Sequence, residues 1–193
     1  GHFRTYGAEF AHGSRFDYRS PLTNIAARLL EVVNEERFPD IVSRDLWGPL
    51  GQEHDADIML DPLGHPVAEG GISCTVRDLA RFGCAYLDDG AVDGVRVLPA
   101  EWVADTWHAT EDTAERFRVG DYHELGWHHY RNALWVFERD RIGAGLGIFG
   151  QYCYVHRPTR TVIARMSTYP TALPDDLGAA TFAAFTKVAE ALA

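Results

Sequence analysis

The stretch Gly13–Leu22, GSRFDYRSPL, carries the chain from a loop into a helix. Ser20 and Pro21 form a typical helix start. A serine hydroxyl can accept hydrogen bonds from free backbone N–H groups, and the fixed φ of proline suits the first helical position. Apolar residues follow at helical spacing and predict a helix over about Ser20–Asn34, with one apolar face packed against a core: Leu22, Ile25, Ala26, Leu29, Leu30 and Val33.

Tyr18 stands in this loop, two residues before the expected cap. Its side chain has two interpretations. An environment that favours the phenolate would make Tyr18 a proton acceptor beside the positive end of the helix dipole. Alternatively, the ring only packs against the helix.

Three stretches in order resemble motifs of the serine β-lactamase-like hydrolases, the superfamily of class C β-lactamases, DD-peptidases, certain esterases and aminohexanoate-dimer hydrolases. Phe16–Ala26, FDYRSPLTNIA, resembles the second motif, Tyr-x-Ser or Tyr-x-Asn. Glu69–Gly83, EGGISCTVRDLARFG, resembles a helix entry of the family. Gly147–Pro158, GIFGQYCYVHRP, followed by Thr161–Ser167, resembles its third-motif strand. The resemblance runs nearly end to end and is nearest to the aminohexanoate-dimer hydrolase and carboxylesterase branch.

The first motif of the family, Ser-x-x-Lys, is absent. No serine is followed by lysine at the third position, and the only lysine is Lys187, near the C-terminus. The chain therefore resembles the C-terminal half of a family member. The resemblance implies that the nucleophilic serine and its lysine come from outside these residues.

The resemblance also implies roles for named residues. Tyr18 matches the tyrosine that shuttles the proton between the serine hydroxyl and the leaving group, and Ser20 matches the polar residue of the second motif. An oxyanion-binding backbone N–H is expected in the third motif, at Ile148 first, then Gly147, with Gly145 and Phe149 in the same region. Class C enzymes carry Lys-Thr-Gly just before this strand, where Ile142–Ala144 stands here, and this argues against a true β-lactamase or penicillin-binding protein.

The composition and net charge of the chain limit the classes of partner and cofactor that we expect. The content of 46% hydrophobic and 24% charged residues is that of a soluble globular protein. A net charge of −10 argues against nucleic acid and anionic membrane surfaces. Gly1–Arg4 is not a signal peptide, although an export signal on a preceding segment would be invisible, so the compartment is open with the cytoplasm as the expectation. Three widely spaced cysteines suggest free thiols, and no metal or cofactor site is expected.

Helices precede strands, which predicts an α+β fold: the C-terminal part of the β-lactamase/transpeptidase-like fold, an antiparallel sheet flanked by helices. Residues 1–121 are the mainly helical part and residues 122–193 hold the strands and a helix over about Leu177–Leu192. Thr75 is expected to cap a helix with Asp78 in its first turn. Gly143–Gly147 is interpreted as a glycine-rich turn.

Further expectations concern the sheet. His128 and His129 should lie on opposite faces of a strand, half-buried or exposed. The sheet should also lack strands that the family has, and an unpaired edge favours aggregation. We therefore expect the N-terminal half of the same enzyme, as a cleaved or separate chain, or a swapped copy, to complete it.

Two functions follow. The first is the C-terminal portion of a serine hydrolase that cleaves an amide or ester bond of a small substrate through an acyl-enzyme, and that is inactive as this chain alone. The second is a non-catalytic binding or structural module that retains the fold. The intact motif around Tyr18 favours the first, because a scaffold has no need of a phenol there.

Overall fold

The computed structural model describes residue 7 and residues 9–120, 122, 126–173 and 175–193. In chain order the elements are α1 (Pro21–Asn34), α2 (Phe38–Val42), the π-helical turn η2 (Ser43–Trp47), β1 (Asp57–Ile58), β2 (Ile72–Ser73), α3 (Val76–Cys84), β3 (Ala91–Val92), β4 (Val95–Arg96), α4 (Ala100–His108), α5 (Glu111–Val119), β5 (His129–Arg131), β6 (Leu134–Glu138), β7 (Ile142–Gly147), β8 (Gln151–His156), β9 (Thr161–Arg165) and α6 (Asp175–Ala191).

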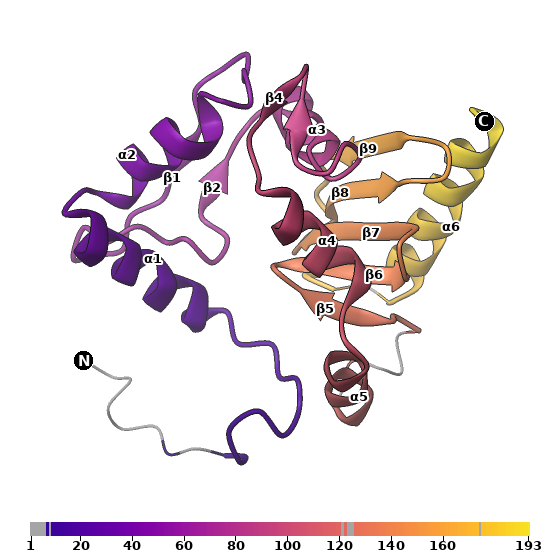
Figure 1. Cartoon of the computed structure of the whole chain (residues 1–193), viewed down its shortest axis with the longest axis horizontal. Coiled ribbons are helices and arrows are strands. Elements are labelled where there is room, and N and C mark those ends of the chain that lie inside the picture. Colours follow the sequence, from indigo (N-terminus) through magenta and orange to yellow (C-terminus); the bar gives the residue numbers. More distant parts are fainter. Residues whose placement is uncertain (1–6, 8, 121, 123–125, 174) are drawn as a thin grey trace.

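Five strands form one antiparallel sheet in the order β5-β6-β7-β8-β9, so each strand pairs with its neighbour in sequence. Helices α3 and α4 cover one face and α6 covers the other (Figure 1). Side chains of β8 alternate between the two faces of the sheet. Val155 joins the core beneath α4, whereas Tyr152 and Tyr154 join the core beneath α6. The predicted α+β architecture with an antiparallel sheet is confirmed.

The core beneath α4 is built around Trp107, whose side chain is fully buried with Val103 and Val136. Gly143 lies directly under this ring, since a Cβ there would sit 3.0 Å from the indole. The interpretation of Gly143–Gly147 as a turn is wrong: these residues form most of β7, a strand with neighbours on both sides. Glycine serves here for close helix-on-sheet packing rather than for chain reversal.

Helix α3 begins as predicted. The side chain of Thr75 accepts a hydrogen bond from the Asp78 backbone N–H, and the Thr75 hydroxyl donates to the Asp78 carboxylate at 2.7 Å. Gly83 then brings the helix against the sheet, because a Cβ at this position would lie 2.7 Å from Val162 and 2.8 Å from Cys153. The cap fixes where α3 starts, and the glycine sets how closely it approaches β8 and β9.

The C-terminal helix is confirmed as α6, although its predicted apolar face is only partly buried. Phe182 and Phe185 pack on Tyr154 with ring centroids 5.3 and 5.5 Å away. Val188 and Leu192 are exposed, so their assignment to the buried face is wrong. Ala189 between them is fully buried in the core beneath α6, so the last turn is covered on one side only.

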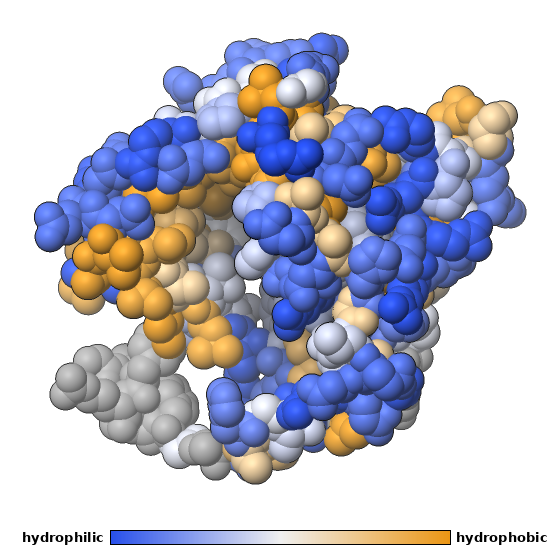
Figure 2. Space-filling model, viewed as in Figure 1, coloured by the Kyte–Doolittle hydropathy of each residue, from blue (hydrophilic) through white to orange (hydrophobic). Residues whose placement is uncertain are grey.

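Helices α1 and α2, the turn η2 and the β1–β2 pair form a separate group beside the sheet, here called the α1 lobe (Figure 1). Helix α1 has the predicted bounds, but its apolar face does not pack on a core: of its residues only Ala27 is buried, and Leu29 is 62% exposed. Figure 2 shows apolar side chains gathered on the surface of this lobe. The same face includes Leu22, Ile25, Leu30 and Val33. Among the described residues, no element covers it.

The expectation for the adjacent histidines is wrong in two respects. Their rings do not lie on opposite faces of a strand, because β5 begins only at His129 and the two rings contact each other through Nδ1. His129 is also completely buried. Its Nε2 donates to the Thr106 carbonyl oxygen at 2.9 Å, and its Nδ1 lies 2.8 Å from Nδ1 of His128. Burial is the main cause that lowers the pKa of His129. The ring is thus a neutral core group.

The sheet has two edges in the described part of the chain, β5 and β9. Within the same residues, no helix combines the length and the apolar character that crossing a membrane requires.

Candidate active site

Tyr18 lies against the sheet rather than on the helix that follows it. Its ring stacks on Trp135 of β6 at a centroid distance of 5.5 Å and an interplanar angle of 27°. Tyr130 of β5 meets the ring edge-on at 5.6 Å. Tyr18 is 37% exposed, and its hydroxyl has no hydrogen-bond partner among the described residues. The interpretation that the Tyr18 ring packs against the helix is therefore wrong, because the ring packs against the sheet. The hydroxyl is free to form a hydrogen bond.

The loop that carries Tyr18 is fixed on its other side by Phe16. The backbone N–H of Phe16 donates to the Arg116 carbonyl oxygen of α5 at 2.9 Å, and its ring lies 5.2 Å from those of Phe117 and Tyr130. A Cβ at Gly120 would lie 2.6 Å from the Phe16 carbonyl oxygen, so a glycine is needed there. Alternate residues of one extended loop thus anchor on α5 and on β6, which sets the position of the Tyr18 ring.

Ser20 does not cap α1 through its side chain. The residue has helical dihedrals, φ −47° and ψ −45°, and makes no side-chain cap hydrogen bond. The chain therefore enters the helix already wound, and the Ser20 carbonyl oxygen accepts from the Thr23 N–H at 3.0 Å. The capping role is wrong. The match of Ser20 to the second motif stays a prediction.

The four residues of the third motif divide between a strand and its turn. Gly145 and Gly147 belong to β7 and pair with Cys153 and Gln151 of β8. The ladder between β6 and β7 ends at Trp135 and Ala144, so the last three residues of β7 pair only with β8. Trp135, the residue on which Tyr18 stacks, is thus the last β6 partner of this strand. The second motif therefore contacts β6 at the residue where its pairing with β7 ends, and β7 continues from there into the third motif.

Ile148 and Phe149 form the turn after β7. Phe149 has φ +60°, its N–H donates to the Ala172 carbonyl oxygen at 2.9 Å, and its carbonyl oxygen accepts from the Tyr169 N–H at 3.0 Å. Ile148 is 57% exposed, and its backbone N–H donates to no described residue. A strained turn that is fixed on one side therefore presents one unpaired N–H.

Gln151 holds this turn from below. Its side-chain amide donates to the Ser167 carbonyl oxygen at 2.6 Å and accepts from the Ser167 N–H at 3.1 Å. The same nitrogen lies 3.3 Å from the Ile148 carbonyl oxygen and 3.4 Å from that of Phe149. Gln151 belongs to the sequence motif, but only the fold reveals what its side chain contacts.

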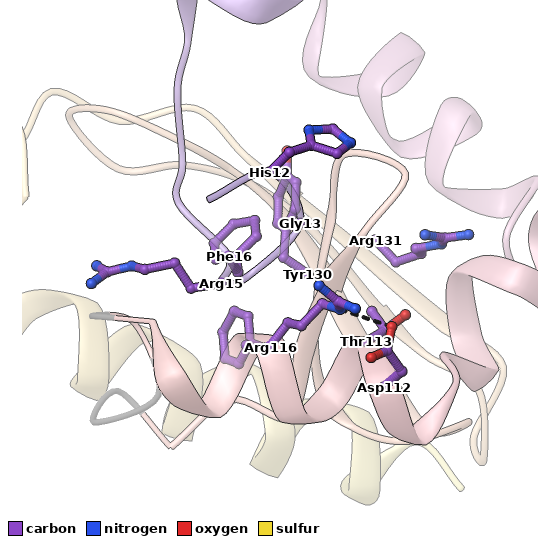
Figure 3. A pocket seen from close by; sticks show the side chains of 10 residues that line it. His12, Gly13, Arg15, Phe16, Asp112, Thr113, Arg116, Tyr130 and Arg131 are labelled. Atoms are coloured by element: carbon purple, nitrogen blue, oxygen red, sulfur yellow. Dashed lines mark hydrogen bonds and ion pairs between the residues drawn. The ribbon is translucent and has the colours of Figure 1, made fainter. Parts of the chain in front are cut away.

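A hollow of about 530 Å³ opens beside the Tyr18 loop, between that loop and α5 (Figure 3). Tyr130 lines the hollow and its ring also contacts Tyr18, so this ring lies between the hollow and the Tyr18 side chain. The other lining residues are His12, Gly13, Arg15, Phe16, Asp112, Thr113, Arg116, Phe117 and Arg131. No sequence motif predicts this hollow, because its walls come from three distant segments.

Neither a nucleophile nor a metal cluster is apparent in the described part of the chain. Lys187 lies on α6, which covers the sheet face opposite α4. No group of three or more metal-binding side chains occurs among the described residues. Three cysteines are free, and burial raises the pKa of the Cys153 thiol to about 12, which makes that thiol inert as a nucleophile.

Comparison with known proteins gives consistent matches. The sequence profile of the Beta-lactamase family matches residues 3–187. The 6-aminohexanoate-dimer hydrolase of Paenarthrobacter ureafaciens is 33% identical over 162 residues, which cover 80% of this chain and 40% of that protein. The chain thus spans less than half the length of the curated relative it matches.

Two solved structures share the fold. The structure named "Putative 6-aminohexanoate-dimer hydrolase from Bacillus anthracis" superposes with a TM-score of 0.82 at 24% identity, over 93% of this chain and 45% of that chain. A structure of a β-lactamase-like protein from Bacteroides dorei DSM 17855, named a "putative beta-lactamase", gives a TM-score of 0.73 at 22% identity, over 91% and 56% of the two chains.

Proposed function

Because this chain belongs to the β-lactamase family, we propose that it forms the tyrosine-bearing part of a serine hydrolase that cleaves an amide or ester bond of a small substrate. The observation that carries the proposal is the Tyr18 hydroxyl, which is unpaired among the described residues, on a ring held against β6 and β5 by Trp135 and Tyr130. A phenol fixed at this place and left without a partner suits proton transfer better than scaffolding.

In the proposed reaction the nucleophilic serine and its lysine come from residues outside these 193. The serine oxygen attacks the carbonyl carbon of the substrate while Tyr18, as the phenolate, takes the serine proton. Tyr18 then gives that proton to the leaving nitrogen or oxygen as its bond to carbon breaks, which leaves an acyl-enzyme. Water then attacks the acyl carbon and gives a proton to the Tyr18 phenolate. Tyr18 returns this proton to the serine oxygen as the bond between that oxygen and the acyl carbon breaks, which releases the acid.

The developing oxyanion requires backbone donors. The Ile148 N–H is the first choice, since it is unpaired within the described chain and the surrounding turn is held by Gln151 and Tyr169. Gly147 is the next choice. Gly145 and Phe149 shape the same segment, although the Phe149 N–H already donates to Ala172.

The substrate is proposed to be an amide or ester other than a β-lactam. Ile142 stands where class C enzymes have the lysine of Lys-Thr-Gly, and its side chain is buried in the core beneath α6. No ammonium group is therefore available at this position to meet the carboxylate of a β-lactam. The name of the Paenarthrobacter relative, an aminohexanoate-dimer hydrolase, supports a linear amide.

The exposed face of α1 supports the second part of the proposal, that another polypeptide segment completes the enzyme. Leu22, Leu29 and Val33 are 60%, 62% and 71% exposed, although they form one helical face. We assign this face to the N-terminal half of the same enzyme, or to a swapped copy, which would bring the serine and lysine to Tyr18.

The proposal is tested in the complete gene product with a fluorophosphonate serine probe and p-nitrophenyl esters. Labelling of a serine outside these residues is expected, and Tyr18→Phe should lower kcat by about 10²–10⁴-fold. Tyr154→Phe is the matched control, because that hydroxyl contacts Thr186 beneath α6. Absence of labelling and turnover would favour the non-catalytic module. Tyr18-dependent turnover by the 193-residue chain alone would exclude an outside nucleophile.

A further inference from the structure

The side chains that line the hollow beside the Tyr18 loop are mainly basic, whereas the chain as a whole is acidic. The chain carries a net charge of −10, yet the hollow is lined by Arg15, Arg116 and Arg131 and only one carboxylate, that of Asp112. In Figure 3 the Arg116 guanidinium and the His12 ring lie on opposite sides of the opening. A local excess of guanidinium groups in an acidic protein favours an anionic ligand.

The arginines are held in place before any ligand arrives. Arg116 donates through Nε to Asp112 at 2.8 Å, and Arg131 donates to both carboxylate oxygens of Asp105 at 2.8 and 2.9 Å. These pairs use Nε of Arg116 and leave its two terminal nitrogens for other acceptors. Fixed guanidinium groups lose less entropy when they bind a carboxylate than mobile ones do.

Tyr130 adds a neutral donor to the same hollow. Its hydroxyl has no hydrogen-bond partner in the described chain, and burial together with the neighbouring Tyr18 raises its pKa to about 12. The hydroxyl therefore stays protonated near neutral pH and can donate to an acceptor oxygen. Because the Tyr130 ring also contacts Tyr18 at 5.6 Å, an anion held here lies next to the proposed reaction centre.

We propose that this hollow binds the carboxylate of the substrate, with Arg116 and Tyr130 as its donors. A guanidinium and a phenol match a carboxylate in shape and hydrogen-bond count. Asp112 in the lining favours a monoanion over a phosphate dianion, because it adds negative charge to the wall. The site of binding stands on this geometry alone, and its assignment to the substrate rests on the proposed function.

The binding site is tested on the 193-residue chain by calorimetric or NMR titration with hexanoate and with hexanamide, its neutral analogue. Hexanoate should bind and hexanamide should not. Arg116→Gln should weaken hexanoate binding by about tenfold, the typical effect of losing a hydrogen bond to a charged group. Tyr130→Phe should weaken it less. Equal binding of the two probes, or unchanged binding by Arg116→Gln, would overturn the proposed site.

Arg118→Gln is the matched control. Arg118 lies on the same helix, pairs with Glu111 and Glu115, and does not line the hollow. Its loss should leave hexanoate binding unchanged. A similar loss of binding in both variants would show only a general effect of charge and would also overturn the site.

The assignment to the substrate is tested in the complete gene product. Arg116→Gln should raise KM for an ester with a terminal carboxylate, and should leave KM for the corresponding methyl-capped ester unchanged. Equal effects on the two esters would overturn the substrate assignment, with hexanoate then a separate ligand. An inactive gene product would refute the proposed function, while the titrations would still decide the carboxylate site.

Discussion

Helices α1 and α3 share one sequence pattern and have opposite surroundings. Both are amphipathic, and each follows a loop that belongs to a family motif. The apolar face of α3 lies on β8 and β9, with Gly83 in contact with Cys153 and Val162. The equivalent face of α1 is open to solvent in the described structure, with Leu29 62% exposed. The difference teaches that amphipathic spacing predicts a partner surface for a helix but does not locate that surface.

The two helices also begin differently. Helix α3 has a side-chain cap from Thr75 and a buried acidic residue, Asp78, in its first turn. Burial opposes ionisation of Asp78, but hydrogen bonds from Thr75 and from the Glu53 N–H outweigh it and lower the pKa of that carboxyl. Helix α1 makes no side-chain cap hydrogen bond. Helix α3 is thus both capped and covered within the described chain, whereas α1 has its proline but no side-chain cap and no covered apolar face there.

The largest expected effect lies at the contact of α3 with the sheet. Gly83→Ala would insert a Cβ within 2.7 Å of Val162 and 2.8 Å of Cys153, both of which are stiff or buried. Helix propensity alone would favour alanine by about 1 kcal/mol, but overpacking usually costs about 1–3 kcal/mol. We expect a net loss of unfolding free energy, measured by urea denaturation.

Gly178→Ala on α6 is the control for that variant. Its nearest neighbour is the Tyr152 hydroxyl at 3.7 Å, an ordinary contact, so alanine should stabilise the helix there. Equal changes of unfolding free energy in the two variants would mean that α3 can move away from the sheet to accommodate the added Cβ. The packing of α3 would then differ less from that of α1 than the structure indicates.

An intermediate effect on the unfolding free energy is expected from pH, and it should arise from His129 in the sheet. The pKa of His129 is lowered in the folded chain, mainly by burial, so the unfolded chain binds the proton more tightly. This contribution to stability is therefore complete above the unfolded pKa of about 6.5 and is lost as the pH falls toward the folded value. Denaturation at a series of pH values should show stability falling below pH ~6.5.

His129→Asn should flatten that pH dependence, whatever its effect on stability at neutral pH. An unchanged slope in the His129 variant would show that acid sensitivity arises elsewhere in the chain.

The smallest effect is expected on α1. Leu29→Ala removes a side chain that is 62% exposed, so the unfolding free energy of the 193-residue chain should change by less than about 0.5 kcal/mol. Urea denaturation monitors the change. A loss of about 2 kcal/mol or more is typical of a buried leucine, and would mean that this face is packed in the chain by itself.

Residue patterns predicted the elements whose signals are local. The bounds of α1, the cap of α3 by Thr75 and the helix α6 all follow from spacing and capping within a single turn or two. Strand β7 was missed because three of its six residues are glycines, which usually mark a turn. The reason for glycine at position 143 is Trp107, a residue of a different element.

The same limit applies to the candidate site. Motif matching selected Tyr18 and the segment from Gly145 to Phe149, but it could not show that the Tyr18 ring stacks on Trp135. Aromatic residues in the strands were visible, while their contact with the Tyr18 loop was not. The positions of Gln151 below the turn after β7 and of Arg116 in the hollow were equally invisible, because their neighbours there come from other segments of the chain.

The sequence by itself determined the family, the antiparallel α+β class, the candidate proton carrier Tyr18 and the absence of a Ser-x-x-Lys pair from these residues. These features depend on residue identity and on spacing along the chain. The tertiary structure alone decided which faces are buried, which ring supports Tyr18, and that Arg116 and Tyr130 line one hollow. Burial and contact depend on what lies across the fold, and local spacing carries no information about that neighbour.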